Sequence, residues 1–333
     1  MTADAVHPWQ RGQWSRLTRD RAAQRLPHAL LIAGPTGTGL RAFAETLGQA
    51  LLCPADPDDA PCGACRGCRL YAAGTHPDAL RIEPAETGKA ISVDAVRALT
   101  ERLSLTGSGT AKVALIDPAE SLTAAAANGL LKTLEEPAGG AHVVLISRRV
   151  ARLPATIRSR CQRVSFGLPD AELAVQWLES HGVESPPQWL ARAGGAPILA
   201  REYAHSANET AAQAATVVDR LLTVLENATV PALSQAERQY PLTLAVPAIA
   251  ATIEDLLRLR YAPARAPLRW PEQRTRMQAL VPALDGPALF DYLDAVYRSM
   301  PGASSSLRPD TQYLGLLVDA AALGAATTKR SRG

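Results

Sequence analysis

The sequence Gly34-Pro35-Thr36-Gly37-Thr38-Gly39-Leu40-Arg41 decides the fold of this 333-residue chain. An apolar run, residues 29–33, precedes it, and a segment with apolar residues at helical spacing follows it. Strand, glycine-rich loop and helix in this order are typical of a P-loop, in which loop amides and the helix N-terminus hold phosphate oxygens. The sequence therefore predicts a P-loop fold whose loop glycines are Gly34, Gly37 and Gly39.

The residues that carry the chemistry of a P-loop are missing. Leu40 stands where a lysine would neutralise phosphate charge, and Arg41 stands where a hydroxyl would meet magnesium. After the apolar run 112–116, Asp117 has the position of the magnesium-holding acid, but Pro118 replaces the glutamate that would activate water. We therefore expect a degenerate P-loop and acidic site, no bound ATP and no intrinsic catalysis. Weak nucleotide binding through Arg41 stays open as an alternative.

Four of the five cysteines, Cys53, Cys62, Cys65 and Cys68, lie within sixteen residues. Two residues separate each neighbouring pair of the last three, and the proline and glycine residues between Cys53 and Cys68 suit tight turns. Four thiolates close a tetrahedral site, whereas a catalytic zinc keeps one position open. The pattern predicts a structural zinc; the alternative is a set of unconnected cysteines in a loop. We expect Cys161 to be buried and to take no part in the site.

The composition excludes few classes of protein. The net charge of +3 permits contact with nucleic acid without arguing for it. No apolar stretch is long enough for a membrane span, and residues 1–16 lack the apolar core of a signal peptide. We therefore expect a cytoplasmic protein that does not contact a membrane.

Apolar strand patterns alternate with helical patterns up to about residue 167, which predicts a parallel sheet with helices on both faces. Thr123 is a candidate N-cap for a helix that ends before Pro137, and residues 151–158 form a helix-sized interval before the last strand. From Asp170 onward only helical patterns occur. The sequence thus predicts an α/β module followed by helical domains.

Several motifs together resemble the delta-prime family of bacterial DNA polymerase III clamp-loader subunits, clearly over residues 25–166. The segments that carry the resemblance are the cysteine module, Ala73-Gly-Thr-His-Pro-Asp78, Ile91-Ser-Val-Asp-Ala-Val-Arg97, Asn128-Gly-Leu-Leu-Lys-Thr-Leu-Glu-Glu-Pro137 and Ser159-Arg160-Cys161. The leucine-rich segment and the Ser-Arg-Cys triplet are shared with the ATP-hydrolysing gamma/tau subunits. The His-Pro-Asp segment and the altered P-loop favour delta-prime.

The resemblance implies an AAA+ module over residues 1–167, with the zinc-binding insertion at 53–68, a helical lid at 168–205 and a C-terminal oligomerisation collar at 206–333. It implies gamma/tau and delta subunits as partners in a five-subunit ring. It further implies the sliding clamp and, through the assembled complex, primed DNA as partners. Such subunits do not hydrolyse ATP but lend an arginine to the ATP of a neighbouring subunit, and Arg160 matches that arginine. Pro197 stands where hydrolysing relatives have a lid arginine, which agrees with this interpretation.

Three other functions remain as hypotheses. An active gamma/tau-type ATPase would need a lysine at position 40. A zinc-containing DNA-binding scaffold conflicts with the acidic Asp56, Asp58 and Asp59 beside the cysteines. Against a P-loop-like scaffold without a replication role, only the combined motifs argue. Ring position, stoichiometry and direct contacts with clamp or DNA do not follow from the sequence.

Overall fold

The computed structural model describes residues 6–86, 89–105, 111–137, 139–205, 210–263, 268–299 and 308–330. The chain forms two compact units, Met1–Gln176 and Trp177–Gly333. The first unit holds all the sheet strands of the described residues, and the second consists of helices and connecting loops.

The first unit is built on a five-stranded sheet with the strand order β2-β3-β4-β1-β5. All neighbouring strands run parallel. β1, β3 and β4 are buried along almost their whole length because helices cover both faces of the sheet. The strands are β1 Ala29–Ala33, β2 Ala79–Ile82, β3 Lys112–Ile116, β4 Ala141–Ser147 and β5 Gln162–Ser165.

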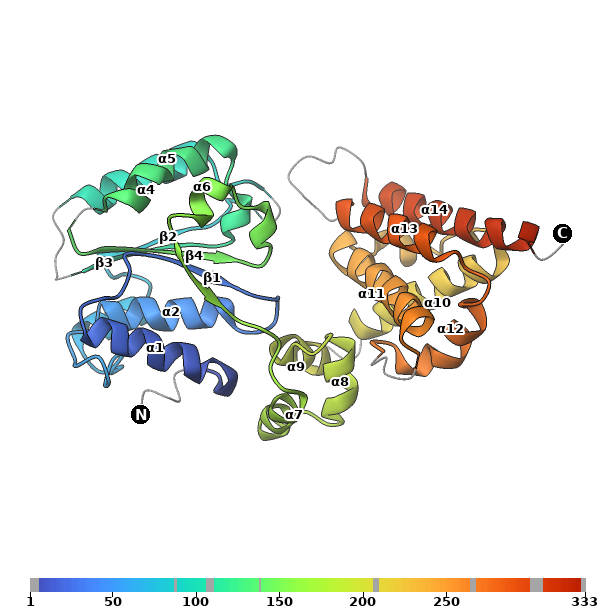
Figure 1. Cartoon of the computed structure of the whole chain (residues 1–333), viewed down its shortest axis with the longest axis horizontal. Helices are drawn as coiled ribbons and strands as arrows, with labels where there is room; N and C mark the ends of the chain where they lie inside the picture. The colour runs from blue at the N-terminus through green and yellow to red at the C-terminus, as the bar shows by residue number, and fades with distance from the viewer. Residues whose placement is uncertain are drawn as a thin grey trace. The chain divides into compact units, whose positions relative to one another are not determined.

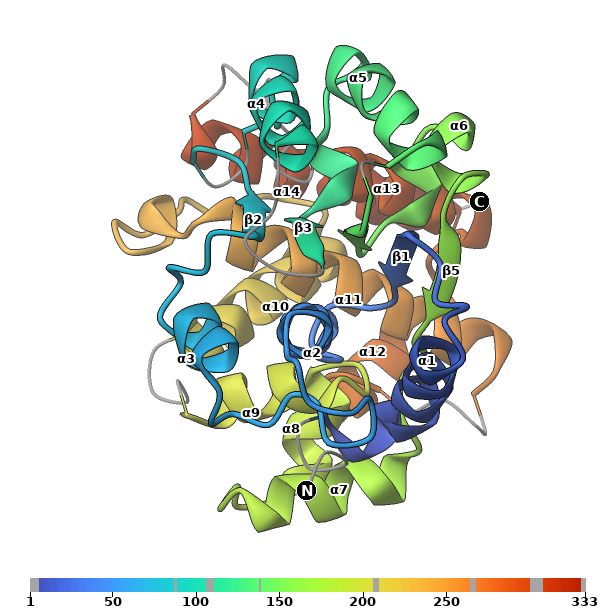
Figure 2. The same ribbon diagram turned by 90° about the vertical axis from the view of Figure 1, so that its left-hand side faces the viewer.

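Helices α4 (Val93–Ser104) and α5 (Ala124–Glu135) cover one face of the sheet, and α1 (Arg11–Ala22) and α2 (Leu40–Leu51) cover the other (Figures 1 and 2). Each face has its own apolar core. The Thr123 hydroxyl accepts a hydrogen bond from the Ala126 amide at 3.1 Å, so the expected N-cap of α5 is present. The predicted parallel sheet with helices on both faces is confirmed.

Shorter elements connect these layers. The helix-sized interval 151–158 is not one helix, because Pro154 separates the 3-10 helix η4 (Val150–Arg152) from α6 (Ala155–Arg158). The other short elements of the unit are η2 Pro8–Gln10, α3 Arg66–Ala72 and η3 Ala119–Ser121.

Parallel pairing sorts the candidate residues to two edges of the sheet. The loops that follow β1, β3 and β4 meet at the carboxyl edge, and they carry Gly34, Asp117 and Arg148. Arg160 precedes β5, an edge strand of the sheet, and therefore lies at the amino edge. The register pairs Leu30 with Gln162, so at least three residues of strand, or roughly 10 Å, separate Arg160 from the glycine loop.

The described residues of the second unit form helices and connecting loops and contain no strand, as expected. Its core forms between α10, α11, α13 and α14, with Val217, Leu221, Ile253, Leu256 and Tyr313 fully buried. The helices are α8 Pro186–Arg192, α9 Pro197–His205, α10 Thr210–Asn227, α11 Leu242–Tyr261, α12 Arg274–Leu280, α13 Gly286–Arg298 and α14 Pro309–Arg330, with the 3-10 helices η5 Glu237–Gln239 and η6 Pro271–Gln273. Helix α7 (Ala171–Ser180) spans the boundary between the units.

No helix within the described ranges combines the length and the apolar composition that a membrane crossing requires.

Candidate functional site

The glycine loop adopts a conformation that only glycine accommodates easily. Gly37 has φ +78° and Gly39 has φ +85°, both in the left-handed region. Gly34 is limited by space instead, since a methyl group placed on it would lie 2.6 Å from the Phe166 carbonyl oxygen. The loop thus keeps the glycine requirement of a P-loop, and Gly39 leads directly into α2.

Leu40, the first residue of α2, is 3% exposed. Its Cδ2 atom approaches to 3.2 Å of the position that a methyl group on Gly34 would take, and it packs in the same core as Phe43. The side chain at the position of a P-loop lysine is therefore directed into the apolar core. It offers no donor or charge to a phosphate.

The loop is also held by residues near the start of the described chain. The Trp9 indole Nε1 donates to the Thr38 carbonyl at 2.9 Å. The Gln10 amide Nε2 donates to the same carbonyl at 2.9 Å and to the Gly39 carbonyl at 3.1 Å. Gln10 is fully buried, so these bonds fix the loop backbone. Sequence reasoning assigned no such role to residues of η2.

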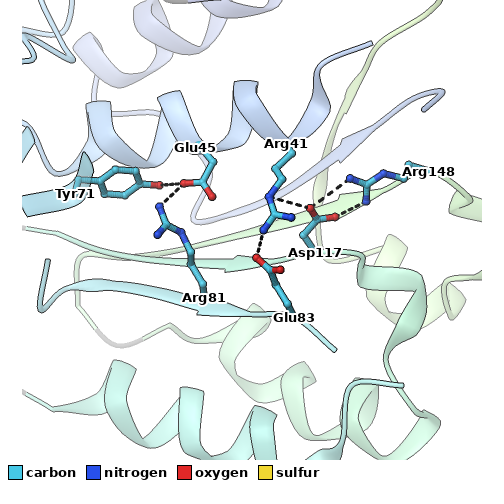
Figure 3. Close-up of polar contacts among 7 residues, drawn as sticks. All are labelled: Arg41, Glu45, Tyr71, Arg81, Glu83, Asp117 and Arg148. Atoms are coloured by element: carbon cyan, nitrogen blue, oxygen red, sulfur yellow. Dashed lines mark hydrogen bonds and ion pairs between the residues drawn. The ribbon is translucent and has the colours of Figure 1, made fainter. Parts of the chain in front are cut away.

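Asp117 is bound by two arginines (Figure 3). Arg148 forms an ion pair with Oδ1 and donates through Nη2 to Oδ2 at 3.3 Å. Arg41 Nε lies 3.7 Å from Oδ2, and the same guanidinium also pairs with Glu83. The carboxylate at the position of a magnesium-holding acid, only 5% exposed, is thus already neutralised by guanidinium groups.

Glu120, two residues beyond Pro118, has a structural role. Its Oε1 accepts a hydrogen bond from the Arg148 amide at 3.1 Å. The contact fixes the backbone that presents the Arg148 side chain to Asp117. Glu120 therefore helps to hold the ion-pair network, defined here as Arg41, Glu83, Asp117 and Arg148.

Sequence reasoning did not single out two members of this network, Glu83 and Arg148. Each directly follows the last residue of a strand, Glu83 after β2 and Arg148 after β4. Asp117 was selected by the same criterion, so the signal was present in the sequence. The order of the strands in the sheet, which brings these residues together, could not be read from the sequence.

The four cysteines Cys53, Cys62, Cys65 and Cys68 come together. Their Sγ atoms all lie within 4.8 Å of one another. A tetrahedral zinc with Zn–S distances of about 2.3 Å places sulfur atoms roughly 3.8 Å apart. Cys53 Sγ and Cys65 Sγ are 4.0 Å apart, so this donor set fits a four-thiolate metal centre. Cys161 is buried and lies outside the cluster, as expected.

Backbone amides near the cluster donate hydrogen bonds to its cysteines. Cys65 caps α3, its Sγ accepting from the Cys68 amide at 3.3 Å. Amide donation from Cys65 and Ala64 lowers the pKa of Cys62 to about 6. Burial raises the pKa of Cys68 to about 12, which makes that thiol dependent on a positive charge to become a thiolate.

The cysteine module is fastened to the sheet through Tyr71 on α3 (Figure 3). The Tyr71 hydroxyl donates to Glu45 of α2 at 2.9 Å, and Glu45 also pairs with Arg81 of β2. Burial raises the pKa of Tyr71, and the neighbouring Glu45 carboxylate raises it further. Loss of order in the module would therefore reach α2, the helix that follows the glycine loop.

Arg160 lies between α6 and β5 at the amino edge of the sheet. Its Nε donates to Glu135 Oε1 at 2.5 Å, and its Nη1 donates to the Thr156 carbonyl at 3.1 Å. About a third of the side chain is exposed. Arg160 is thus oriented by two neighbours and accessible from outside, while the network at the carboxyl edge is a separate group of residues.

Comparison with known proteins gives the family. A family model described as "DNA polymerase III, delta subunit" matches residues 9–169. The DNA polymerase III subunit delta-prime of Pseudomonas aeruginosa is 41% identical over 223 residues, which are 65% of this chain and 67% of that protein. The subunit delta-prime of Escherichia coli K12 is 41% identical over 186 residues, 56% of each chain.

A gamma subunit-related protein of DNA polymerase III from Thermotoga maritima matches by structure over 94% of this chain and 99% of its own. The TM-score is 0.41 and the sequence identity is 18%, so this likeness does not bear on the family of the chain. The assignment depends on the sequence matches, which cover the sheet, the glycine loop and the cysteine module. On these grounds the chain belongs to the delta-prime subunit family of bacterial DNA polymerase III.

Proposed function

We propose that this chain is the non-hydrolysing delta-prime subunit of a clamp loader and helps to load the sliding clamp on primed DNA during replication. Its AAA+ P-loop module, cysteine cluster and helical second unit agree with the family. The matched segment spans 67% and 56% of the two relatives' lengths, so the activity and partners of the complete complex belong to the proposal.

The proposal that the chain does not hydrolyse ATP depends on the residues of the glycine loop and on the ion pairs of Asp117. Phosphoryl transfer needs cations on the phosphates and a held magnesium ion. Here the lysine position is a buried leucine, and Asp117 is bound by Arg41 and Arg148. Pro118 offers no carboxylate to activate water. This arrangement supports a P-loop that has lost ATP chemistry, and it argues against a gamma/tau-type ATPase.

Arg160 is proposed to act in trans on the ATP of a neighbouring subunit. It lies at the opposite edge of the sheet from the chain's own glycine loop, so it is badly placed to serve that loop. It is partly exposed, and Glu135 and Thr156 hold its guanidinium. An arginine so placed can stabilise charge that develops on a transferred phosphoryl group across a subunit boundary.

We propose zinc as the metal of the four-cysteine cluster, with a structural role. Cys53, Cys62, Cys65 and Cys68 supply the soft thiolate donors that zinc accepts in closed tetrahedral sites. The Glu45–Tyr71–Arg81 contacts support a role in bracing α2 rather than in chemistry.

The second unit is proposed to contain the lid, residues 168–205 with α7, α8 and α9, and the collar, residues 206–333. Large apolar side chains on α13 and α14, Phe290, Tyr297, Leu314 and Val318, are substantially exposed. Leu314 and Val318 are one helical turn apart on α14, which suits contact with a neighbouring subunit. We expect gamma/tau and delta subunits to be these neighbours, with clamp loading in the cytoplasm.

Reconstitution tests the proposal. The purified chain is mixed with gamma/tau and delta subunits, and complex formation is followed by light scattering and clamp loading on primed DNA. We expect a stoichiometric complex that loads clamps only when this chain is present, while the isolated chain releases no phosphate from ATP. A chain that does not enter the complex contradicts the delta-prime assignment. ATP turnover by the isolated chain that disappears on Gly39→Ala contradicts the non-hydrolysing part.

A further inference from the structure

The second unit contains a cavity of about 270 Å³ to which the proposed function assigns no role. Its walls come from α8, α9, α10 and α11 and from the segment before η6. The wall includes the side chains of Trp189, Arg192, Tyr203, Pro247, Arg269 and Trp270.

Most of the wall is apolar or aromatic. Trp189, Tyr203 and Trp270 contribute flat rings, and the side of α11 contributes Pro247 and Ala251 together with neighbouring small residues. Burial raises the pKa of Tyr203, so its phenol stays neutral. Rings of this kind favour a flat apolar group, because stacking buries large areas with little loss of rotamer freedom.

The charged residues lining the cavity are both arginines. Arg192 lies over the Trp189 ring with its Cζ 5.1 Å from the ring centroid, and its Nη2 donates to Glu272 at 2.9 Å. Arg269 Nη2 lies 3.2 Å from Glu254. The acidic partners are not among the described residues that form the wall, so the interior of the cavity favours an anion.

Several N–H groups of the same residues have no partner within the described part of the chain. They are the Nε groups of Arg192 and Arg269 and the indole Nε1 of Trp270. Trp270 is 6% exposed. Buried donors are nearly always paired in folded proteins, so a group of unpaired donors around one cavity indicates that an acceptor binds there.

Arg269 is held in place by backbone packing. Gly194 has φ +62°, and a methyl group on it would lie 2.9 Å from the Arg269 Cζ atom. The guanidinium therefore packs against the turn between α8 and α9, while its ion-pair partner Glu254 belongs to α11. Both arginines are positioned before any ligand arrives, which reduces the entropic cost of binding.

We propose that this cavity binds a small organic carboxylate with a flat apolar body. The carboxylate would pair with the guanidinium edge that includes Nε, and the body would lie between the aromatic rings and α11. The ligand would connect α8 and α9 with α11. This inference is independent of the clamp-loader assignment, since it depends only on the second unit.

Isothermal titration of the full-length chain with 2-naphthoate and indole-3-acetate tests the proposal, with 2-naphthamide as the neutral counterpart. We expect saturable one-to-one binding with a Kd on the order of 0.1 mM and at least about tenfold weaker binding of the amide. Hydrogen exchange should slow in residues 189–203 and 243–251 when 2-naphthoate is added. Absence of saturable binding of either carboxylate at about 5 mM overturns the proposal.

Variants locate the site. Ala251→Leu fills the cavity, and Arg192→Met and Arg269→Met each remove a charge while keeping an apolar stem. Each should weaken 2-naphthoate binding about tenfold or more, whereas Arg97→Met, at an exposed arginine of the first unit, should not change it. If Ala251→Leu does not fold, the two arginine variants are sufficient to test the proposal. Binding that is equal in these variants and in the control is adventitious and contradicts the proposal.

Discussion

The two edges of the sheet differ in how their arginines are used. At the carboxyl edge, Arg41 and Arg148 are committed to Asp117 and Glu83 within the chain. At the amino edge, Arg160 is held by Glu135 and Thr156 but stays accessible. Under the proposed function, the fold has lost the site that receives a phosphate and keeps, in Arg160, a residue that acts on a phosphate elsewhere. Loss of catalysis at one edge does not imply loss of a catalytic contribution at the other.

The largest expected effect is that of Arg160→Ala on the partner's ATP hydrolysis. We expect the rate at the site it serves to fall by about 10³-fold or more, because arginine fingers contribute about 10³–10⁵ in comparable systems. Arg160→Lys should recover little, since an ammonium lacks the planar fork. The measurement is clamp- and DNA-stimulated phosphate release by reconstituted complexes.

Arg158→Ala is the matched control, at a neighbouring arginine with no proposed role. It should leave hydrolysis within about twofold of the wild type, as expected for a solvated surface cation. Equal rates for the Arg160→Ala and wild-type complexes would contradict a role of Arg160 in the partner's ATP hydrolysis. The two edges of the sheet would then not differ in catalytic contribution.

The next effect concerns the cysteine module, which contacts α2 through Tyr71 and Glu45. Cys65→Ser should lose zinc and lower stability by about 2.7 kcal/mol in free zinc at roughly 100 times the Kd of the intact site. Metal analysis and thermal unfolding, with and without chelator, provide the measurement. Cys161→Ser should retain the full metal content. A chain purified without chelator that holds less than about half an equivalent of metal, and melts unchanged on chelation, contradicts a zinc site.

Asp117→Asn should destabilise the first unit by about 1–3 kcal/mol, because it leaves the Arg148 and Arg41 guanidinium groups without their buried anion. Denaturant unfolding measures the loss. Asp94→Asn, at a highly exposed residue of α4, is the control and should change stability by less than about 0.5 kcal/mol. An Asp117→Asn chain as stable as the wild type would mean that the ion-pair network contributes nothing to the carboxyl edge.

The smallest effect is expected for Glu135→Gln, which weakens the orientation of Arg160 without removing it. The pair is half-exposed, and exposed ion pairs contribute about 0.2–1 kcal/mol. Partner ATP hydrolysis should therefore fall by roughly two- to fivefold, with KM for ATP unchanged. A loss as large as that of Arg160→Ala would show that Glu135 has a larger role than orienting the arginine.

Local chemistry explains which features could be predicted from the sequence. The glycine loop, the Thr123 cap and the cysteine cluster depend on residues close together in the chain, and the structure contains each of them. Strand positions followed from apolar runs because the sheet is covered on both faces. The family resemblance is confirmed by the sequence comparisons.

Features that depend on strand order or helix packing could not be predicted. Glu83, Asp117 and Arg148 meet because β2, β3 and β4 are neighbours, and no local pattern specifies that order. The cavity of the second unit requires α8, α10 and α11 to come together over a long sequence separation. The break at Pro154 was visible in the sequence, and a stricter use of proline would have divided the interval 151–158.

The ion-pair network also bears on how reversible the proposed loss of hydrolysis is. A lysine introduced at position 40 would enter a core position and would meet an Asp117 that Arg41 and Arg148 already neutralise. Replacing either arginine alone removes a favourable charge pair and still leaves Pro118 in place of the water-activating acid. We therefore expect each of these single changes to lower stability without a gain in turnover. Under the proposed function, a valley therefore separates the two states on a fitness landscape, and we expect that point mutations taken one at a time do not lead back to an active enzyme.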